Sequence, residues 1–111
     1  PLTIDHSLVG ELVRLGQISH EEAKRHPQRN VLMRAIGADA SVEVDCRSIY
    51  LHRDDVFLLC TDGFSNMISD QELTEEFLEP RSWEERLEKL RQLTLERGAP
   101  DNFTALCCIL E

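Results

Sequence analysis

Residues 56–63 read VFLLCTDG, and the rest of the chain is interpreted around this stretch. Five apolar residues followed by the turn pair Asp62-Gly63 predict a short buried strand with a carboxylate at its end. A second stretch, PDNFTALCCILE at residues 100–111, places Asp101 before another apolar run. Carboxylates held at strand ends suit a hard divalent cation, because such ions prefer oxygen ligands in a fixed arrangement. We therefore predict that Asp62 and Asp101 share one metal ion.

Each of these acids also has a simpler interpretation, as part of an ordinary surface turn. Asp-Gly is a favoured turn pair, and Asp-Asn, at residues 101–102, is turn-prone too. Either motif taken alone leaves open whether its carboxylate binds anything. The remainder of the chain has to distinguish a metal site from two unrelated turns.

The size and charge of the chain limit the classes of protein to consider. Its 111 residues, of which 41% are hydrophobic, suffice for one domain with a real core, and the opening PLTIDHS reads as the middle of a longer polypeptide. A formal net charge of -9 argues against a nucleic-acid backbone or an anionic membrane surface as the main partner. The apolar runs are shorter than the roughly 20 residues of a membrane span, and no signal-peptide arrangement is present.

The cysteines indicate a reducing compartment. Cys46, Cys60, Cys107 and Cys108 show no CxxC spacing, and three of them fall in the predicted core strands, where free thiols behave as small apolar groups. Adjacent residues of a strand point to opposite faces, so Cys107 and Cys108 are not expected to form a disulfide with each other. We therefore predict a cytoplasmic protein.

Two short helices are predicted near the beginning of the chain. Residues 7–15 place leucines on one helical face, with Ser7 as N-cap and Gly16 as the C-terminal stop. The sequence SHEE at residues 19–22 is a capping box that begins a second helix, which has to end before Pro27. Together they predict a compact helical segment.

Residues 42–51, VEVDCRSIYL, alternate apolar and polar side chains and then become apolar. This pattern predicts a strand with one solvated face, broken by a bulge. The turn at residues 53–55 then favours a hairpin in which this strand pairs with residues 56–60.

Two further helices follow the Asp-Gly motif. Asp70 is expected to cap the first, which directs Leu73, Phe77 and Leu78 inward and ends at Pro80.

The second of these helices is predicted to be the longest of the chain and to pack on a sheet face. It begins with the capping box SWEE at residues 82–85 and ends at Gly98. Its apolar stripe consists of Leu87, Leu90 and either Leu93 or Thr94.

Three separated stretches carry a resemblance to a known family. They are LTIDHSLVGELVRLGQISHEEAKRHPQRNVLMRAIG at residues 2–37, VFLLCTDGFSN at residues 56–66 and GAPDNFTALCCIL at residues 98–110. In content, order and spacing they resemble the C-terminal part of bacterial metal-dependent serine/threonine protein phosphatases, the PPM family of type 2C. The resemblance covers nearly the whole chain.

The resemblance implies an α+β fold, in which this chain forms part of an α-β-β-α sandwich of two antiparallel sheets flanked by helices. Residues 1–111 would be the C-terminal portion of a single phosphatase domain. The helical segment at about residues 7–37 would correspond to the flap beside the active site of relatives, a region linked there to substrate choice. Its simpler interpretation is a plain surface feature. Arg29 and Arg34 either meet phosphate or form structural ion pairs, and His6 is expected to be a structural hydrogen-bonding residue.

The resemblance also implies the chemistry. Asp62 and Asp101 fall on two aspartates that bind the same Mn²⁺ or Mg²⁺ ion of a binuclear centre in relatives. In some bacterial relatives the first of these aspartates also touches a third, weaker ion, so that Asp62 would bridge two ions there. Two such ions activate a water that attacks the phosphorus of phosphoserine or phosphothreonine. The implied role is signal transduction, with phosphoproteins and a cognate serine/threonine kinase as partners.

The N-terminal half of the family's domain is absent from this chain, and that half is itself an expected partner. It carries the aspartate that bridges the metals, a phosphate-binding arginine and a histidine proposed as general acid. We therefore assign no catalytic residue to this chain, and expect residues 1–111 alone to be inactive. Two alternatives stay open: a catalytically inactive phosphatase-like domain that binds or senses phosphoproteins, and an interaction domain whose acids are ordinary turns.

Overall fold

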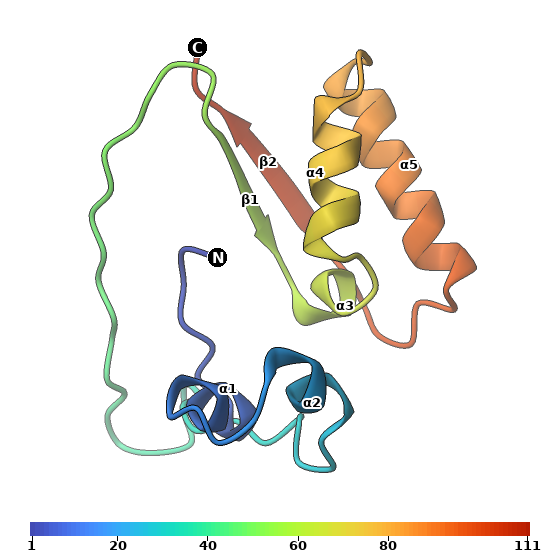
Figure 1. Ribbon diagram of the computed structural model, residues 1–111. Coiled ribbons are helices and arrows are strands. Elements are labelled where there is room, and N and C mark those ends of the chain that lie inside the picture. Colours follow the sequence, from blue (N-terminus) through green and yellow to red (C-terminus); the bar gives the residue numbers. More distant parts are fainter. The chain divides into compact units, whose positions relative to one another are not determined.

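Seven short helices and strands are distributed over two units of the chain, residues 1–48 and 49–111. The structure, a computed structural model, describes all 111 residues. In chain order the elements are α1 (Leu8–Arg14), α2 (His20–Arg25), β1 (Val56–Cys60), α3 (Asp62–Ser65), α4 (Asp70–Leu78), α5 (Trp83–Glu96) and β2 (Ala105–Ile109) (Figure 1).

The two helices of the first unit begin and end where local sequence predicts. The Ser7 side chain accepts a hydrogen bond from the Gly10 N–H at the start of α1, and α1 ends before Gly16, whose φ of 70° only glycine adopts readily. In α2, Ser19 and Glu22 form the predicted capping box, and the helix ends before Pro27. Local capping is therefore sufficient to place both helices.

The sheet of the second unit consists of β1 and β2, which pair antiparallel. The predicted hairpin is wrong, because residues 41–52 form no regular secondary structure. The Asp54 N–H donates to the Leu110 carbonyl (2.8 Å) and the Leu110 N–H donates to the Asp55 carbonyl (3.0 Å), so the chain entering β1 is tied to the end of β2 instead. The alternation of apolar and polar side chains in residues 42–51 therefore does not predict which strand pairs with β1.

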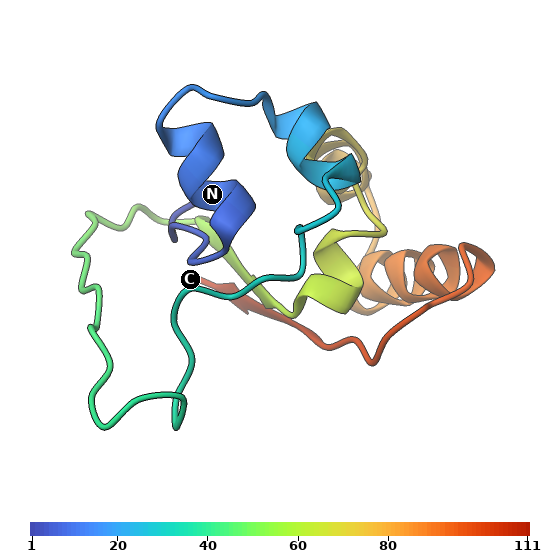
Figure 2. The same cartoon turned by 90° about the horizontal axis from the view of Figure 1, so that it is seen from below.

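Within this unit, helices cover one face of the sheet. Leu58 of β1 and Ala105 of β2 pack against the core formed by Phe64, Ile68 and Leu90, and α3, α4 and α5 lie on one side of the strands (Figure 2). On the other face Leu59 is 58% exposed. The prediction of a fully buried strand is therefore wrong.

The cysteines follow the same pattern of partial burial. Cys60 and Cys108 are exposed, Cys107 is partly buried, and all four cysteines are free. Of the three strand cysteines expected to be buried, only Cys107 is partly buried. The expectation is wrong for Cys60 and Cys108.

The start of α4 lies one residue from the predicted cap. Ser69 is the N-cap and forms a capping box with Glu72, whereas Asp70 is the first helical residue. Leu73 and Phe77 pack against the core, but Leu78 is 79% exposed, so its predicted inward orientation is wrong. The helix instead buries the charged residue Glu76, which the apolar pattern did not indicate.

α5 is the longest helix and follows its prediction closely. Ser82 and Glu85 form the capping box, and the helix ends before Gly98, which has a φ of 95°. Leu90 is 2% exposed and Thr94 is fully buried, where its hydroxyl donates to the Leu90 carbonyl. The α+β class is thus confirmed, and no helix combines the length and apolar character that crossing a bilayer requires.

Candidate metal centre

The Asp-Gly motif does not end β1 but opens the helical turn after it. The strand stops at Cys60, and Thr61 is the N-cap of α3, so Asp62 is the first residue of that short helix. The Phe64 N–H donates to the Thr61 carbonyl (3.0 Å), and the Phe64 side chain is buried in the core. Burial of Phe64 therefore turns the chain immediately after the strand, which corrects the predicted position of Asp62.

Asp101 likewise lies outside its strand, in the loop before β2, which begins only at Ala105. Two hydrogen bonds continue the contact between the chains beyond the paired strands. The Thr61 N–H donates to the Thr104 carbonyl (3.0 Å), and the Thr104 N–H donates to the Thr61 side-chain oxygen (3.0 Å). The two acidic motifs are therefore held at the same end of the sheet.

Gly63 lets the two motifs come into contact. A Cβ atom at this position would overlap the carbonyl oxygen of Asn102 and lie 3.4 Å from the Cβ of Asp101. Gly63 is buried, and its backbone is helical, so the glycine is required here for space and not for a special φ. The loop that carries Asp101 thus rests directly on the turn that begins with Asp62.

Both carboxylates are exposed at this junction. One oxygen of Asp101 accepts a hydrogen bond from the Asn102 N–H (2.7 Å), which fixes the orientation of the side chain. Carboxylate oxygens are the ligands that Mg²⁺ and Mn²⁺ prefer, so the residue types at the two contacting motifs fit such an ion as part of its ligand set. The structure gathers no group of three or more metal-binding side chains, and a shared ion at Asp62 and Asp101 stays a prediction.

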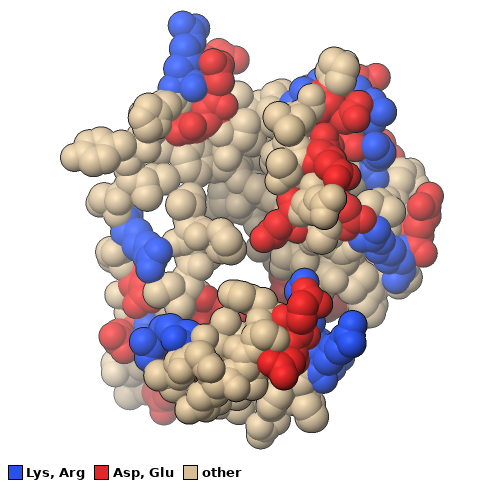
Figure 3. All heavy atoms as spheres, in the orientation of Figure 1, with Lys and Arg blue, Asp and Glu red and all other residues tan.

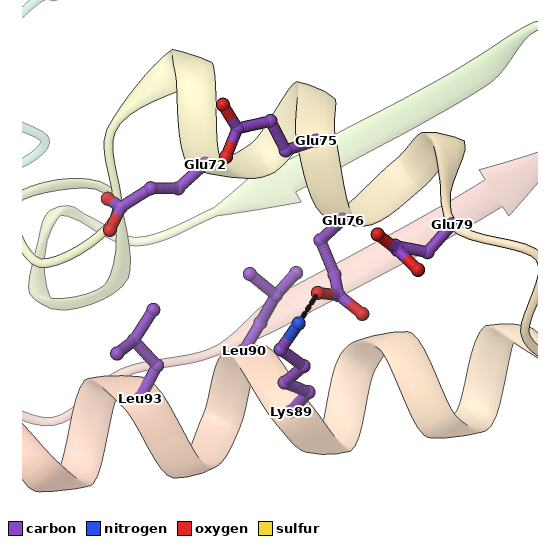
Figure 4. A pocket seen from close by; sticks show the side chains of 7 residues that line it. All are labelled: Glu72, Glu75, Glu76, Glu79, Lys89, Leu90 and Leu93. Atoms are coloured by element: carbon purple, nitrogen blue, oxygen red, sulfur yellow. Dashed lines mark ion pairs between the residues drawn. The ribbon is translucent and has the colours of Figure 1, made fainter.

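A second gathering of carboxylates lies elsewhere, in a pocket of about 240 Å³ between α4 and α5 (Figure 4). It is lined by Glu72, Glu75, Glu76, Glu79, Lys89, Leu90 and Leu93. Here Glu76 is paired with Lys89 and with Arg81 (3.0 Å), and acidic and basic side chains are interspersed over these helices (Figure 3). The pair of Glu76 and Lys89 therefore links α4 to α5.

Glu72 in the same pocket forms a contact between the two helices. Its carboxylate is paired with the Arg97 guanidinium, and this hydrogen bond together with those from the N–H and side chain of Ser69 lowers the pKa of Glu72 from 4.5 to about 2. The carboxylate therefore stays ionised and paired over the ordinary pH range.

In the first unit, the side chains considered beside the metal ligands have structural partners. Arg34 pairs with Glu43 (3.2 Å) and Asp45 (3.0 Å), and His6 lies 2.7 Å from Asp45. The interpretation of Arg34 as a structural ion-pair residue and of His6 as a hydrogen-bonding residue is thus confirmed. Arg29 is exposed.

A scan against models of known protein families found no match. Among curated proteins, the serine/threonine phosphatase Stp of Listeria monocytogenes serotype 4b is 41% identical over 105 residues, which are 95% of this chain and 42% of that protein. A putative protein phosphatase of 2C type from Streptococcus pyogenes serotype M6 is 42% identical over 103 residues, which are 93% of this chain and 42% of that protein.

Solved structures of serine/threonine phosphatases also match this chain over nearly its whole length. Serine/threonine phosphatase Stp1 from Staphylococcus aureus matches 99% of this chain with a TM-score of 0.92 and 35% identity, over 43% of its own length. The catalytic domain of serine/threonine protein phosphatase PstP, solved with two manganese ions, matches 99% of this chain with a TM-score of 0.74 and 30% identity, over 45% of its own length. The chain spans less than half the length of the curated relatives that it matches.

Proposed function

Because this chain belongs to the bacterial serine/threonine phosphatases of the PPM family, type 2C, we propose that it is the C-terminal part of their domain, in an enzyme that hydrolyses phosphoserine and phosphothreonine in proteins. The observation that supports this proposal most is the contact between the Asp62-Gly63 turn and the Asp101-Asn102 loop. The contact joins two motifs that lie almost forty residues apart in the sequence, each of which carries a hard oxygen donor.

Asp62 and Asp101 are proposed to bind one Mn²⁺ or Mg²⁺ ion of a centre that holds two, and in some states three. The relative PstP was solved with two manganese ions, which supports the choice of metal. When bound, such ions supply an activated water and neutralise the charge on phosphate oxygens. The proposed role of this chain is to hold the two carboxylates in place. Gly63 allows the turn to pack closely against Asn102, and the Asn102 N–H orients the Asp101 side chain.

The other groups of the site are proposed to come from the part of the domain that relatives have in addition. Since two carboxylates are too few for a binuclear centre, residues 1–111 by themselves are expected to be inactive. The proposed partners are phosphoproteins and, among them, a cognate serine/threonine kinase, and the proposed location is the cytoplasm.

The proposal is tested on the full-length protein with a phosphothreonine peptide as substrate. Asp62→Asn and Asp101→Asn should each abolish Mn²⁺-dependent hydrolysis and the rise in melting temperature that Mn²⁺ causes, while the melting temperature without metal stays nearly unchanged. Asp54→Asn is the matched control, because Asp54 is exposed and its φ of 68° suits asparagine equally well.

Unchanged metal-dependent hydrolysis in both site variants would contradict the assignment of the ligands. Binding of the phosphopeptide without turnover by the unmodified protein would favour the alternative from the sequence, an inactive domain that senses phosphoproteins.

A further inference from the structure

Thr61 lies where the pairing of the sheet meets the first turn of α3. The register that pairs Cys60 with Ala105 brings Thr61 opposite Thr104. The Thr61 N–H donates to the Thr104 carbonyl (3.0 Å), as it would in a continued sheet. Residues that face each other at such a position of an antiparallel pair exchange two backbone hydrogen bonds. The second of these would run from the Thr104 N–H to the Thr61 carbonyl.

The Thr61 carbonyl is already used by the helix that follows. It accepts hydrogen bonds from the N–H groups of Phe64 (3.0 Å) and Ser65 (3.2 Å), which belong to α3. The Thr104 N–H donates instead to Oγ1 of Thr61 (3.0 Å). The hydroxyl thus takes the place of the carbonyl. The chain can therefore turn into α3 at Asp62 and keep both hydrogen bonds to the segment that leads into β2.

The hydroxyl of Thr61 has no role in capping α3. Thr61 is the N-cap residue of this helix, but its side chain accepts no hydrogen bond from it. The serines at the same position of α4 and α5 each accept such a bond. Removal of the Thr61 hydroxyl therefore affects the contact across the sheet and leaves the capping of α3 unchanged.

The hydrogen bond to Thr104 reaches the loop that carries Asp101. The three residues after Asp101 are each held by the second unit. The Asn102 carbonyl oxygen lies directly against Gly63, and the Phe103 side chain packs against the hydrophobic core. Thr104 is bound through its N–H and its carbonyl. These contacts fix the backbone that follows Asp101 against the Asp-Gly turn, and the hydroxyl supplies the one that a side-chain substitution can remove.

We propose that Thr61 is a positioning residue of the metal centre, whose hydroxyl holds the loop of Asp101 in place for sharing a Mn²⁺ or Mg²⁺ ion with Asp62. This inference rests on the proposed function, because it requires both aspartates to be ligands of one ion. Hard ions need their oxygen ligands in a fixed arrangement, so a looser loop lowers the affinity for the metal. The backbone bond to Thr104 and the packing of Gly63 do not depend on the hydroxyl. Its removal therefore weakens the site without abolishing it.

Thr61→Val in the full-length protein tests the inference, because valine keeps the branched shape of threonine and lacks the hydroxyl. The apparent dissociation constant for Mn²⁺, measured by isothermal titration calorimetry, should rise about twofold to tenfold, which is the usual effect of one hydrogen bond. Hydrolysis of the phosphothreonine peptide at saturating Mn²⁺ should stay close to that of the unmodified protein. Thr61→Ser keeps the hydroxyl and should restore the affinity.

Thr74→Val is the matched control, because the Thr74 hydroxyl donates to the Asp70 carbonyl within α4 (2.8 Å). This variant should bind Mn²⁺ as the unmodified protein does. Hydrogen exchange of the Thr104 amide in the metal-free protein supplies a second readout, which needs neither metal nor substrate. The amide should exchange faster in Thr61→Val and at an unchanged rate in Thr74→Val.

Unchanged Mn²⁺ affinity in Thr61→Val would overturn the inference, even if the metal-free variant melted at a lower temperature, because the role of Thr61 would then be structural only. A Thr61→Ser variant as weak as Thr61→Val, or an equal loss of affinity in Thr74→Val, would overturn it too. Each of these results leaves the proposed function intact. Unchanged Mn²⁺-dependent hydrolysis in both Asp62→Asn and Asp101→Asn contradicts the proposed function itself, and this inference with it.

Discussion

Gly63 and Asn102 are in such close contact that no side chain fits between them: a Cβ on Gly63 would overlap the Asn102 carbonyl oxygen. The contact joins two turns that follow one strand and precede the other. Packing of the backbone, and not only the presence of two acids, thus decides how near Asp62 and Asp101 can come.

Gly63→Ala should destabilise the protein by about 1–3 kcal/mol, the usual cost of forcing an extra methyl group into a packed site. It should also reduce the rise in melting temperature caused by Mn²⁺, because the loop that carries Asp101 has to move away. Gly16→Ala is the control, since Gly16 has a φ of 70° and no atom within 4 Å of the added methyl. That variant should lose stability without any change in the response to Mn²⁺, and an equal change in both would contradict this role of Gly63.

Leu90→Ala should lower the free energy of unfolding by about 2–5 kcal/mol, because Leu90 is at the centre of the core and its removal leaves a cavity. Urea denaturation monitored by circular dichroism measures the change. Leu95→Ala, on the same helix but with 44% of the side chain exposed, should cost well under about 1 kcal/mol. Similar losses in the two variants would show that α5 packs through another face.

Glu76→Gln should destabilise the second unit by about 1–3 kcal/mol, since the buried carboxylate would lose its charge opposite Lys89 and Arg81. Glu75→Gln changes the neighbouring, exposed residue of the same helix and should stay within about 0.5 kcal/mol. Thermal unfolding of the two variants side by side checks the difference. No difference between them would mean that the ion pairs of Glu76 do not stabilise the contact between α4 and α5.

Glu72 should make stability depend on pH in the acid range. The Arg97 guanidinium, and after it the Ser69 N–H, lowers the pKa of Glu72 from 4.5 to about 2 in the folded protein. A lowered pKa means that the stabilisation is complete above about pH 4.5 and is lost as the pH falls toward 2. Between about pH 5 and pH 3 the melting temperature of Glu72→Gln should therefore fall less steeply than that of the unmodified protein. Parallel profiles would contradict the prediction, and Glu75→Gln serves as control.

Helix boundaries could be predicted because capping is local. In the boxes at residues 19–22 and 82–85, the serine and the glutamate three residues later satisfy each other's backbone N–H groups without help from the rest of the fold. Ser69 and Glu72 carry the same signal, but Asp70 is also a good N-cap residue, so the local sequence is ambiguous by one position.

Strand pairing and burial could not be predicted in the same way. The partner of β1 is β2, about fifty residues later, and nothing in the alternation of residues 42–51 excludes the nearer pairing. Burial of Leu59 depends on how many layers cover the sheet, which a run of apolar residues does not reveal.

The candidate site was only partly accessible from sequence. Asp-Gly and Asp-Asn mark where Asp62 and Asp101 lie, but the spatial role of Gly63 requires coordinates. The ion pair between Arg34 and Asp45 joins two residues outside helices and strands. The sequence around them has no hydrophobic periodicity, so it does not predict this contact.

Leu59 and Leu106 lie opposite each other in the register of β1 and β2, and more than half of each side chain is in contact with water. The two strands also have no further neighbour at either edge. An exposed apolar surface next to unpaired strand edges favours the addition of strands from other molecules to the sheet. When this polypeptide is produced in isolation, concentrated samples should therefore aggregate through β-addition, and light scattering should fall once Leu59 and Leu106 are replaced by lysine.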